Sequence, residues 1–243
     1  MNILIDIFHI VLYQPLFNAL VLLYQYLPGH DFGIAVIVLT ILTRLLFYPL
    51  MIKAIKSQKA LSEIQPKIQE IQRKYKNDKQ KQAKATMEMY HREKINPFSG
   101  CLPLLIQLPI LLALYRVFWR GLQPAEQVYL YNFVHLTSPI SSSFLGILDL
   151  AKPNIELALL AGIFQFIQTK MITPHQKKNK GGQPQMMDIM QKQMVYFFPI
   201  ITVFILWKLP AAIGLYWIVT SLFSIVQQYL VFKKPGQKAL AQI

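Results

Sequence analysis

Apolar residues along this chain fall into five long runs separated by polar, mostly basic stretches. A helix that crosses a bilayer needs about 20 predominantly apolar residues. The run 194–209 yields only about 24 Å of helix, so we expect local bilayer thinning beside it. The pattern predicts an all-α membrane protein with five transmembrane helices, over residues 32–52, 101–120, 145–171 (firmest over 155–170), 194–209 and 211–232.

Residues 1–31 are apolar but interrupted by polar groups, including Asp6, His9 and Gln14-Pro15, and by several tyrosines. Tyrosine concentrates at the membrane–water interface, and a proline early in the run disfavours one straight span. The sequence therefore predicts an extracytoplasmic helix lying in the interface. The apolar positions are dense enough that a true span is the open alternative.

Residues 53–97 are polar, yet their apolar residues recur at spacings of three and four, which is typical of a coiled-coil seam. The pattern breaks at Lys76-Asn77-Asp78-Lys79 and then resumes. We predict an antiparallel helical hairpin with a kink at Pro66. It is either a solvated structural element or a docking surface for a partner. The predicted seam residues are Leu61, Ile64, Ile68, Ile71 and Tyr75 on one arm, and Ala83, Met87 and Tyr90 on the other.

The net charge of +14 is concentrated in three segments, with twelve Lys and Arg in 53–97, five in 170–192 and three in 233–238. Basic loops stay on the cytoplasmic side. This predicts an outside amino end, an external loop at 121–143, a cytoplasmic loop at 172–193 and a basic cytoplasmic tail at 233–243. Because the charge follows membrane topology, we expect no specific nucleic acid partner.

Catalytic and metal-binding patterns are missing from the sequence. The single Cys101 excludes an internal disulfide and a multi-cysteine metal site. No HExxH motif, paired intramembrane aspartates, Ser/His pair or Gly-rich phosphate loop occurs. We therefore predict that the protein is not an enzyme and has no cofactor.

Arg44 is the one charge inside the run 32–52, about 18 Å from its start and 12 Å from its end if helical. A guanidinium keeps its charge, and at a helix centre it costs about 2.5–3.5 kcal/mol. We expect Arg44 to face a polar, wet interior. The alternatives are snorkelling to the surface, as we expect for Arg116 and Arg120, or pairing with a carboxylate, none of which lies inside the clearest spans.

Uncharged polar residues also occur at membrane depth. They either turn with Arg44 toward a shared hydrated groove or make ordinary hydrogen bonds between helices. These residues are Thr40, Thr43, Gln107, Gln165, Gln168, Ser221 and Ser224.

Several motifs together resemble the YidC/Oxa/Alb family of membrane protein insertases, over nearly the whole chain from Pro15. They are Arg44 with Tyr48-Pro49-Leu50, the hairpin segment Gln65-Pro66-Lys67-Ile68-Gln69, the run from Asn96-Pro97-Phe98 through Cys101 to Pro109, the Pro199 span, and Leu215-Tyr216-Trp217 with Gln227-Gln228.

The resemblance implies five helices around a hydrophilic groove that opens to the cytoplasm and the lipid. Arg44 would be the groove arginine, and Thr40, Gln107, Pro109, Tyr216 and Trp217 would line the path of the substrate. The implied activity is insertion of small membrane proteins without nucleotide hydrolysis, in a bacterial plasma membrane.

The implied partners are nascent membrane-protein substrates, the lipid bilayer, and the Sec translocon and ribosome. The sequence carries no large extracytoplasmic domain and no leading anchor helix, and its carboxyl tail is short. We therefore expect no role tied to those parts and no strong independent ribosome binding. The functional alternatives are a small anion or solute transporter and a structural scaffold associated with a translocon.

Overall fold

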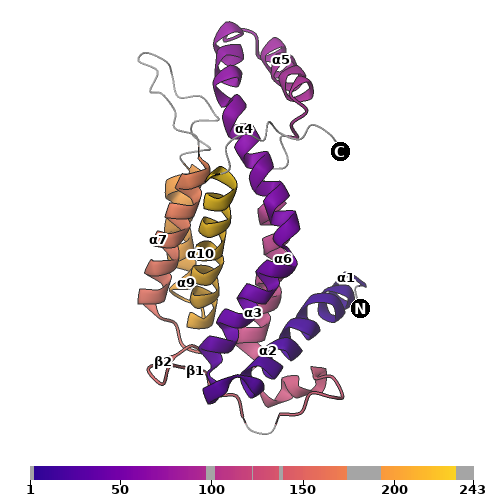
Figure 1. Ribbon diagram of the computed structural model, residues 1–243, viewed down its shortest axis with the longest axis vertical. Coiled ribbons are helices and arrows are strands. Elements are labelled where there is room, and N and C mark those ends of the chain that lie inside the picture. Colours follow the sequence, from indigo (N-terminus) through magenta and orange to yellow (C-terminus); the bar gives the residue numbers. More distant parts are fainter. Residues whose placement is uncertain (1–2, 97–101, 122, 137–138, 174–192, 234–243) are drawn as a thin grey trace.

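The computed structural model describes residues 3–96, 102–121, 123–136, 139–173 and 193–233 (Figure 1). The amino-terminal half contains helices α1 (Ile3–Phe8), η1 (His9–Tyr13, a π-helix), α2 (Gln14–Tyr26), η2 (Pro28–His30), α3 (Phe32–Leu46), α4 (Tyr48–Lys74), α5 (Lys79–Arg92) and α6 (Leu102–Arg120). After them come η4 (Pro124–Tyr129), strands β1 (Ser143–Phe144) and β2 (Leu148–Asp149), α7 (Ile155–Ile172), η5 (Gln193–Phe197), α9 (Phe198–Leu206) and α10 (Ala211–Lys233).

The described helices confirm an all-α membrane protein. Among the described residues, Ile5–Tyr26, Ile155–Ile172 and Ala211–Lys233 are each long and apolar enough to cross a membrane, and the bent pair α3–α4 makes a fourth span if its two helices are taken as one. Gln193–Leu206 is a shorter apolar helix. The count of five spans therefore stays a prediction, as does the interfacial placement of the amino-terminal helix.

The predicted helix over 32–52 is not continuous. It breaks at Phe47, and α3 and α4 meet at an angle of 68°. Pro49 explains the break, because it has no N–H to donate to the carbonyl of Leu45 and its ring clashes with that turn. Pro49 then occupies the first turn of α4, where proline is tolerated. The predicted kink site, Pro66, instead lies inside the uninterrupted α4.

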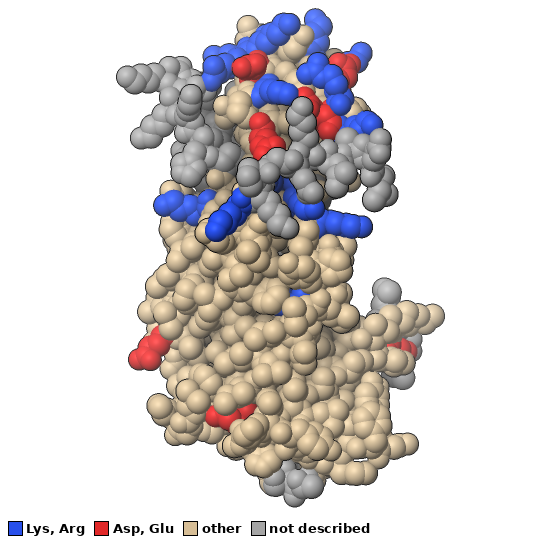
Figure 2. Space-filling model, in the orientation of Figure 1, with Lys and Arg blue, Asp and Glu red and all other residues tan. Residues whose placement is uncertain are grey.

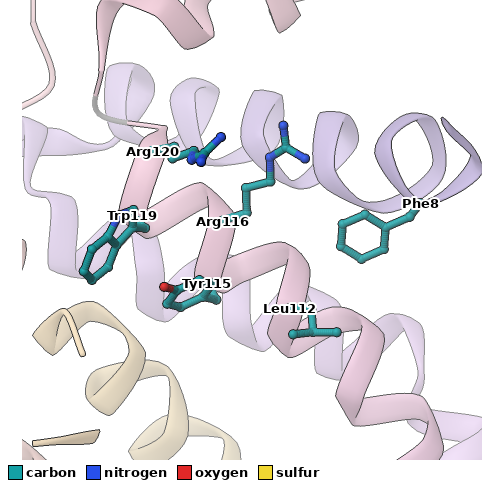
Figure 3. A pocket seen from close by; sticks show the side chains of 6 residues that line it. All are labelled: Phe8, Leu112, Tyr115, Arg116, Trp119 and Arg120. Carbon is teal, nitrogen blue, oxygen red and sulfur yellow. The ribbon is translucent and has the colours of Figure 1, made fainter. Parts of the chain in front are cut away.

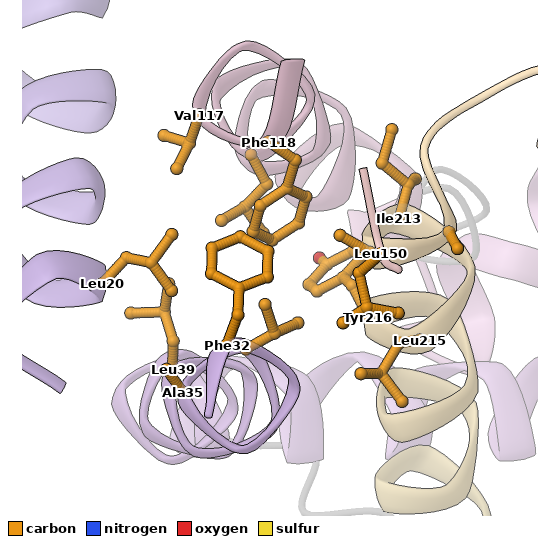
Figure 4. Packing of buried hydrophobic residues seen from close by; sticks show 14 of the residues in the cluster. Leu20, Phe32, Ala35, Leu39, Val117, Phe118, Leu150, Ile213, Leu215 and Tyr216 are labelled. Atoms are coloured by element: carbon orange, nitrogen blue, oxygen red, sulfur yellow. The ribbon is translucent and has the colours of Figure 1, made fainter. Parts of the chain in front are cut away.

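The main hydrophobic core lies where α2, α3, α6 and α10 meet (Figure 4). The rings of Phe32 and Phe118 cross edge to face with centroids 6.1 Å apart. Leu20, Val117 and Ile213 pack around them and are buried. Apolar contact thereby holds together four helices from both ends and the middle of the chain.

Within the predicted span 145–171, the firmest part is helical as predicted, whereas residues 145–154 are not. Strands β1 and β2 pair antiparallel, with Ser143 opposite Asp149, and α7 begins only at Ile155. Asn154 terminates the loop because its side chain accepts a hydrogen bond from the N–H of Leu157 at 2.8 Å, an N-cap. The hydropathy of 145–154 therefore reflects a packed hairpin rather than helix.

This hairpin is tied to the ends of two core helices. Asp31 caps α3 by accepting from the N–H of Ile34 at 2.9 Å, and its other carboxylate oxygen accepts from the N–H of Leu145. The N–H groups of Ala211 and Ala212, at the start of α10, donate to the carbonyls of Lys152 and Leu150. The loop therefore closes one end of the helix bundle.

At the opposite end, α4 and α5 form the predicted hairpin (Figure 1). Ile64 and Ile68 pack against Tyr90 in a small second core. The predicted seam on α5 is wrong at Ala83 and Met87, which are exposed. The packing face of α5 is instead shifted by one residue, and Gln82 Nε2 donates to the carbonyl of Gln72 at 3.1 Å.

The hairpin surface is ionic. Figure 2 shows Lys and Arg gathered over this end, with a largely uncharged surface below. Lys67 Nζ bridges the arms to Glu93 Oε1 at 2.7 Å and lowers the pKa of that carboxyl. A lowered carboxyl pKa adds stability above the unfolded-state pKa, and this is lost as pH falls through the folded value. The pair is solvent-exposed, so salt weakens it.

The contact between Gly33 of α3 and Phe144 of β1 generates a first prediction. A Cβ on Gly33 would lie 2.0 Å from Phe144 Cδ2 and 2.8 Å from its Cβ, so Gly33→Ala must displace the strand. We expect a cost of about 1–3 kcal/mol, measured as a lower thermal unfolding midpoint in detergent. Gly214→Ala is the control, since its Cβ would meet Leu157 at an ordinary 3.4 Å. Equal midpoints for the two variants would contradict the packing.

The hairpin core generates a second prediction. Ile68 is 0% exposed and Met87 is 49% exposed. Ile68→Ala should therefore cost about 2–5 kcal/mol locally, and the amides of α5 should exchange hydrogen faster. Met87→Ala should leave that exchange unchanged. Equal exchange in both variants would show that α5 is not held by this core.

Candidate functional site

Arg44 lies in the last turn of α3, immediately before the break at Phe47. Its side chain is only 8% exposed. The carboxyl end of a helix carries partial negative charge on its free carbonyls, which favours a cation there. The break caused by Pro49 therefore creates a favourable backbone environment for a charge buried inside the protein.

Two neutral side chains hold the guanidinium in a hydrogen-bonded chain across three helices. Arg44 Nη2 donates to Gln107 Oε1 of α6 at 2.6 Å. Gln107 Nε2 in turn donates to the hydroxyl of Tyr216 on α10. No ion pair within the described part of the chain involves Arg44. Its positive charge is thus solvated by dipoles and left without a counter-ion.

A narrow crevice opens beside this chain of hydrogen bonds. Its volume is about 10 Å³, enough for roughly one water molecule. In this conformation the site is therefore nearly closed and is not an open groove. The crevice is lined by Thr43, Arg44, Phe47, Met51, Gln107, Ile110 and Tyr216.

The six predicted site residues divide into two groups. Arg44, Gln107 and Tyr216 meet at the crevice, whereas Thr40, Pro109 and Trp217 do not line it. The role of all six residues as substrate contacts stays a prediction.

The residues of the second group lie within helices or bond to other partners. Thr40 is buried one turn before Arg44 and donates to the carbonyl of Val36 at 2.6 Å. Trp217 Nε1 donates to Gln165 Oε1 of α7 at 3.0 Å, which links α10 to the neighbouring helix. Pro109 is half-buried inside α6.

Three residues that line the crevice, Phe47, Met51 and Ile110, were not predicted from the sequence. Thr43 was expected only as a polar residue at membrane depth. Their spacing from Arg44 and Gln107 along the sequence could have identified them. Ile110 follows Gln107 by three positions on α6 and so shares its helix face. Phe47 and Met51 follow Arg44 by three and seven positions, which matches one face of the continuous helix expected from the sequence, although the chain bends by 68° between α3 and α4.

Further polar side chains are buried along α10. Ser221, Gln227 and Gln228 are almost fully buried, as is Gln65 on the adjoining α4. One polar atom of each finds no hydrogen-bond partner among the described residues. Such an orphaned group costs about 1–3 kcal/mol. Among the described residues, no group of His, Cys, Asp or Glu could hold a metal.

Several helices are long and apolar enough to cross a bilayer, and one apolar helix buries an arginine. These features define a polytopic membrane protein. The sequence model described as "60Kd inner membrane protein" matches residues 22–238. The chain therefore belongs to this family, the YidC/Oxa/Alb family, and is a multi-pass inner membrane protein.

Three relatives are each named "Membrane protein insertase YidC". The protein of Fusobacterium nucleatum is 37% identical over 84% of this chain and 87% of its own length. That of Oceanobacillus iheyensis is 36% identical over 84% of this chain and 76% of its length. That of Geobacter metallireducens is 34% identical over 92% of this chain, which spans only 37% of that longer protein.

The hydrogen-bonded chain generates a third prediction. Gln107→Leu leaves the Arg44 guanidinium without its acceptor, which should cost about 1–3 kcal/mol or more. The double variant Arg44→Leu/Gln107→Leu should recover stability, because replacing both partners by apolar groups removes the buried charge. Thermal unfolding in detergent measures both effects. Gln168→Leu on α7, a half-buried glutamine, is the matched control. A Gln107→Leu midpoint equal to the control would mean that water already solvates Arg44.

Proposed function

We propose that this protein is a membrane protein insertase that helps small membrane proteins enter the bilayer without nucleotide hydrolysis. Family membership and the names of the relatives support the activity. The observation that carries the mechanism is the buried Arg44, which is held by the neutral Gln107 and not by a carboxylate. An uncompensated positive charge at membrane depth suits transient binding of an acidic segment.

The mechanism has three steps. A short extracytoplasmic tail of the substrate, often acidic, enters beside Arg44 from the cytoplasmic side. Arg44 lowers the cost of bringing its negative charge into the membrane, as an opposite charge does at low dielectric. The apolar segment of the substrate then moves past α6 and α9 into lipid, and hydrophobic partitioning supplies the free energy.

The crevice must widen for this to happen, and the buried polar row on α10 supports such opening. Ser221, Gln227 and Gln228 each keep a polar atom that finds no hydrogen-bond partner among the described residues. Water or the backbone of an entering segment would satisfy these atoms in an open groove. Opening therefore exchanges apolar contacts for hydrogen bonds that the closed state lacks.

The proposed orientation places the amino end outside and the carboxyl end in the cytoplasm. The twelve Lys and Arg of 53–97 support it, since positive charge is retained inside. The α4–α5 hairpin would then project into the cytoplasm, where it could receive substrate and meet the ribosome or the Sec translocon.

A fourth prediction tests the charge directly. Proteoliposomes containing only this protein are supplied with a single-span substrate whose translocated tail is acidic. Arg44→Ala should reduce insertion about tenfold, which corresponds to about 1.4 kcal/mol, and Arg44→Lys should keep most activity. Lys152→Ala, which removes an exposed positive charge in the loop before α7, is the control.

The outcomes separate the mechanism from its alternatives. Wild-type insertion that survives Arg44→Ala would reject charge capture and leave hydrophobic sliding. Failure of the wild type to insert, together with Arg44-dependent anion flux, would favour a transporter. A substrate with a neutral tail should be insensitive to Arg44→Ala.

A further inference from the structure

A second hollow, much larger than the Arg44 crevice, lies between the amino-terminal helix and the carboxyl-terminal half of α6. Its volume is about 480 Å³. Phe8 lines one side, and Leu112, Tyr115, Arg116, Trp119 and Arg120 line the other (Figure 3). The hollow combines two cations with an apolar and aromatic wall. We call it the two-arginine cleft.

Arg116 and Arg120 are one helical turn apart, and Figure 3 shows both side chains projecting from the same side of α6. Residues four apart on a helix are neighbours, and like charges there repel each other. Neither arginine forms an ion pair with any described residue. Two unneutralised guanidinium groups side by side are a strong site for an anion.

Glu126, a buried carboxylate, is bonded to Tyr13 and not to either arginine. Glu126 accepts a hydrogen bond from the hydroxyl of Tyr13, and Arg116 lies over the ring of Tyr13, 4.7 Å from its centroid. Arg116 Nε is buried without a hydrogen-bond partner among the described residues. Tyr13 therefore fixes the position of Arg116 and leaves its donors available.

The surroundings of the cleft indicate which kind of molecule would carry the bound anion. Ile7, Ile10 and Val11 on the amino-terminal helix are more than half exposed, as is Leu112 on α6. In a membrane protein, an exposed apolar surface of this kind contacts acyl chains. Tyr115 and Trp119, stacked with centroids 5.7 Å apart, are residue types that concentrate at the interface.

We propose that the two-arginine cleft binds the phosphate of an anionic phospholipid. Arg116 and Arg120 hold the phosphate oxygens, and Phe8, Leu112 and Trp119 lie along the acyl chains. The lipid would neutralise the two cations and join the amino-terminal helix to α6. This site is separate from the Arg44 crevice and does not depend on the proposed insertase mechanism.

Lipid retention by the purified full chain tests the proposal. Native mass spectrometry from detergent micelles would compare phosphatidylglycerol with phosphatidylcholine of the same acyl chains. Each arginine near a headgroup contributes about 1 kcal/mol, so Arg116→Gln/Arg120→Gln should weaken phosphatidylglycerol binding about tenfold or more. Phosphatidylcholine binding should change little.

Three further variants serve as controls for this test. Lys152→Gln/Lys208→Gln removes the same charge from exposed lysines elsewhere and should keep the wild-type preference. Arg116→Lys/Arg120→Lys retains the charge and should keep most of it. Arg120→Gln alone changes an exposed residue and should lower the preference severalfold even if Arg116 is needed for folding.

A second measurement locates the lipid. Phosphatidylglycerol with brominated acyl chains should quench the fluorescence of Trp119, and the quenching should be lost in Trp119→Phe. Millimolar inorganic phosphate should not displace the lipid.

Three results would overturn the proposal. The first is an unchanged lipid preference in Arg116→Gln/Arg120→Gln. The second is displacement by inorganic phosphate, which would assign the cleft to a free anion. The third is displacement of the lipid by a soluble acidic peptide, which would assign it to a protein segment.

Discussion

The structure depends on burying one guanidinium without a carboxylate. Arg44 is 8% exposed and donates a hydrogen bond to the amide oxygen of Gln107, whose amide nitrogen in turn donates to Tyr216. A carboxylate in place of Gln107 would form a buried ion pair that is strongly destabilising to break. A neutral partner holds the side chain in position while leaving its charge available. The three helices that supply these residues must therefore stay in register, and the aromatic core around Phe32 and Phe118 keeps them so.

The two ends of the bundle are held in contrasting ways. At one end, the β1–β2 hairpin is fastened by Asp31 and by backbone hydrogen bonds to the start of α10. Toward the other end, α10 buries polar side chains, including Gln227 and Gln228, with atoms that find no hydrogen-bond partner among the described residues. Because water or an entering segment would pair with these atoms, we expect the bundle to open on the side of the α4–α5 hairpin. This asymmetry agrees with the proposed entry of substrate from the cytoplasm.

Hydropathy and helical spacing predicted most of the helices, the hairpin and the importance of Arg44, because those features depend on local composition. They did not predict the break at Phe47, which follows from steric conflict around Pro49 inside an otherwise strong apolar run. They also assigned the α5 face through Met87, because a polar helix with few apolar residues leaves its packing face undetermined. At the site, Gln107 and Tyr216 were recognisable as polar residues at membrane depth. Their meeting with Arg44 is a long-range contact that no local pattern encodes.

From the sequence, we expected the Arg116 side chain to extend toward the membrane surface, which considers one side chain alone. The structure instead pairs that side chain with Tyr13 and leaves Arg120 beside it, so the relevant unit is two residues and a neighbouring helix. The role of an arginine near a membrane surface therefore depends on the neighbouring side chains as well as on its depth. Sequence position alone did not distinguish an arginine that anchors a helix at the interface from one that lines a cleft.

Helix α4 has a mechanical consequence. It runs from Tyr48, beside the crevice, to Lys74 at the tip of the hairpin, a helix of about 40 Å with Pro66 inside it. Met51, in its first turn, is part of the crevice wall and follows the bend at Phe47. One continuous helix therefore supplies both a wall of the crevice and an arm of the hairpin. A tilt of this helix would change the position of the hairpin and the width of the crevice together.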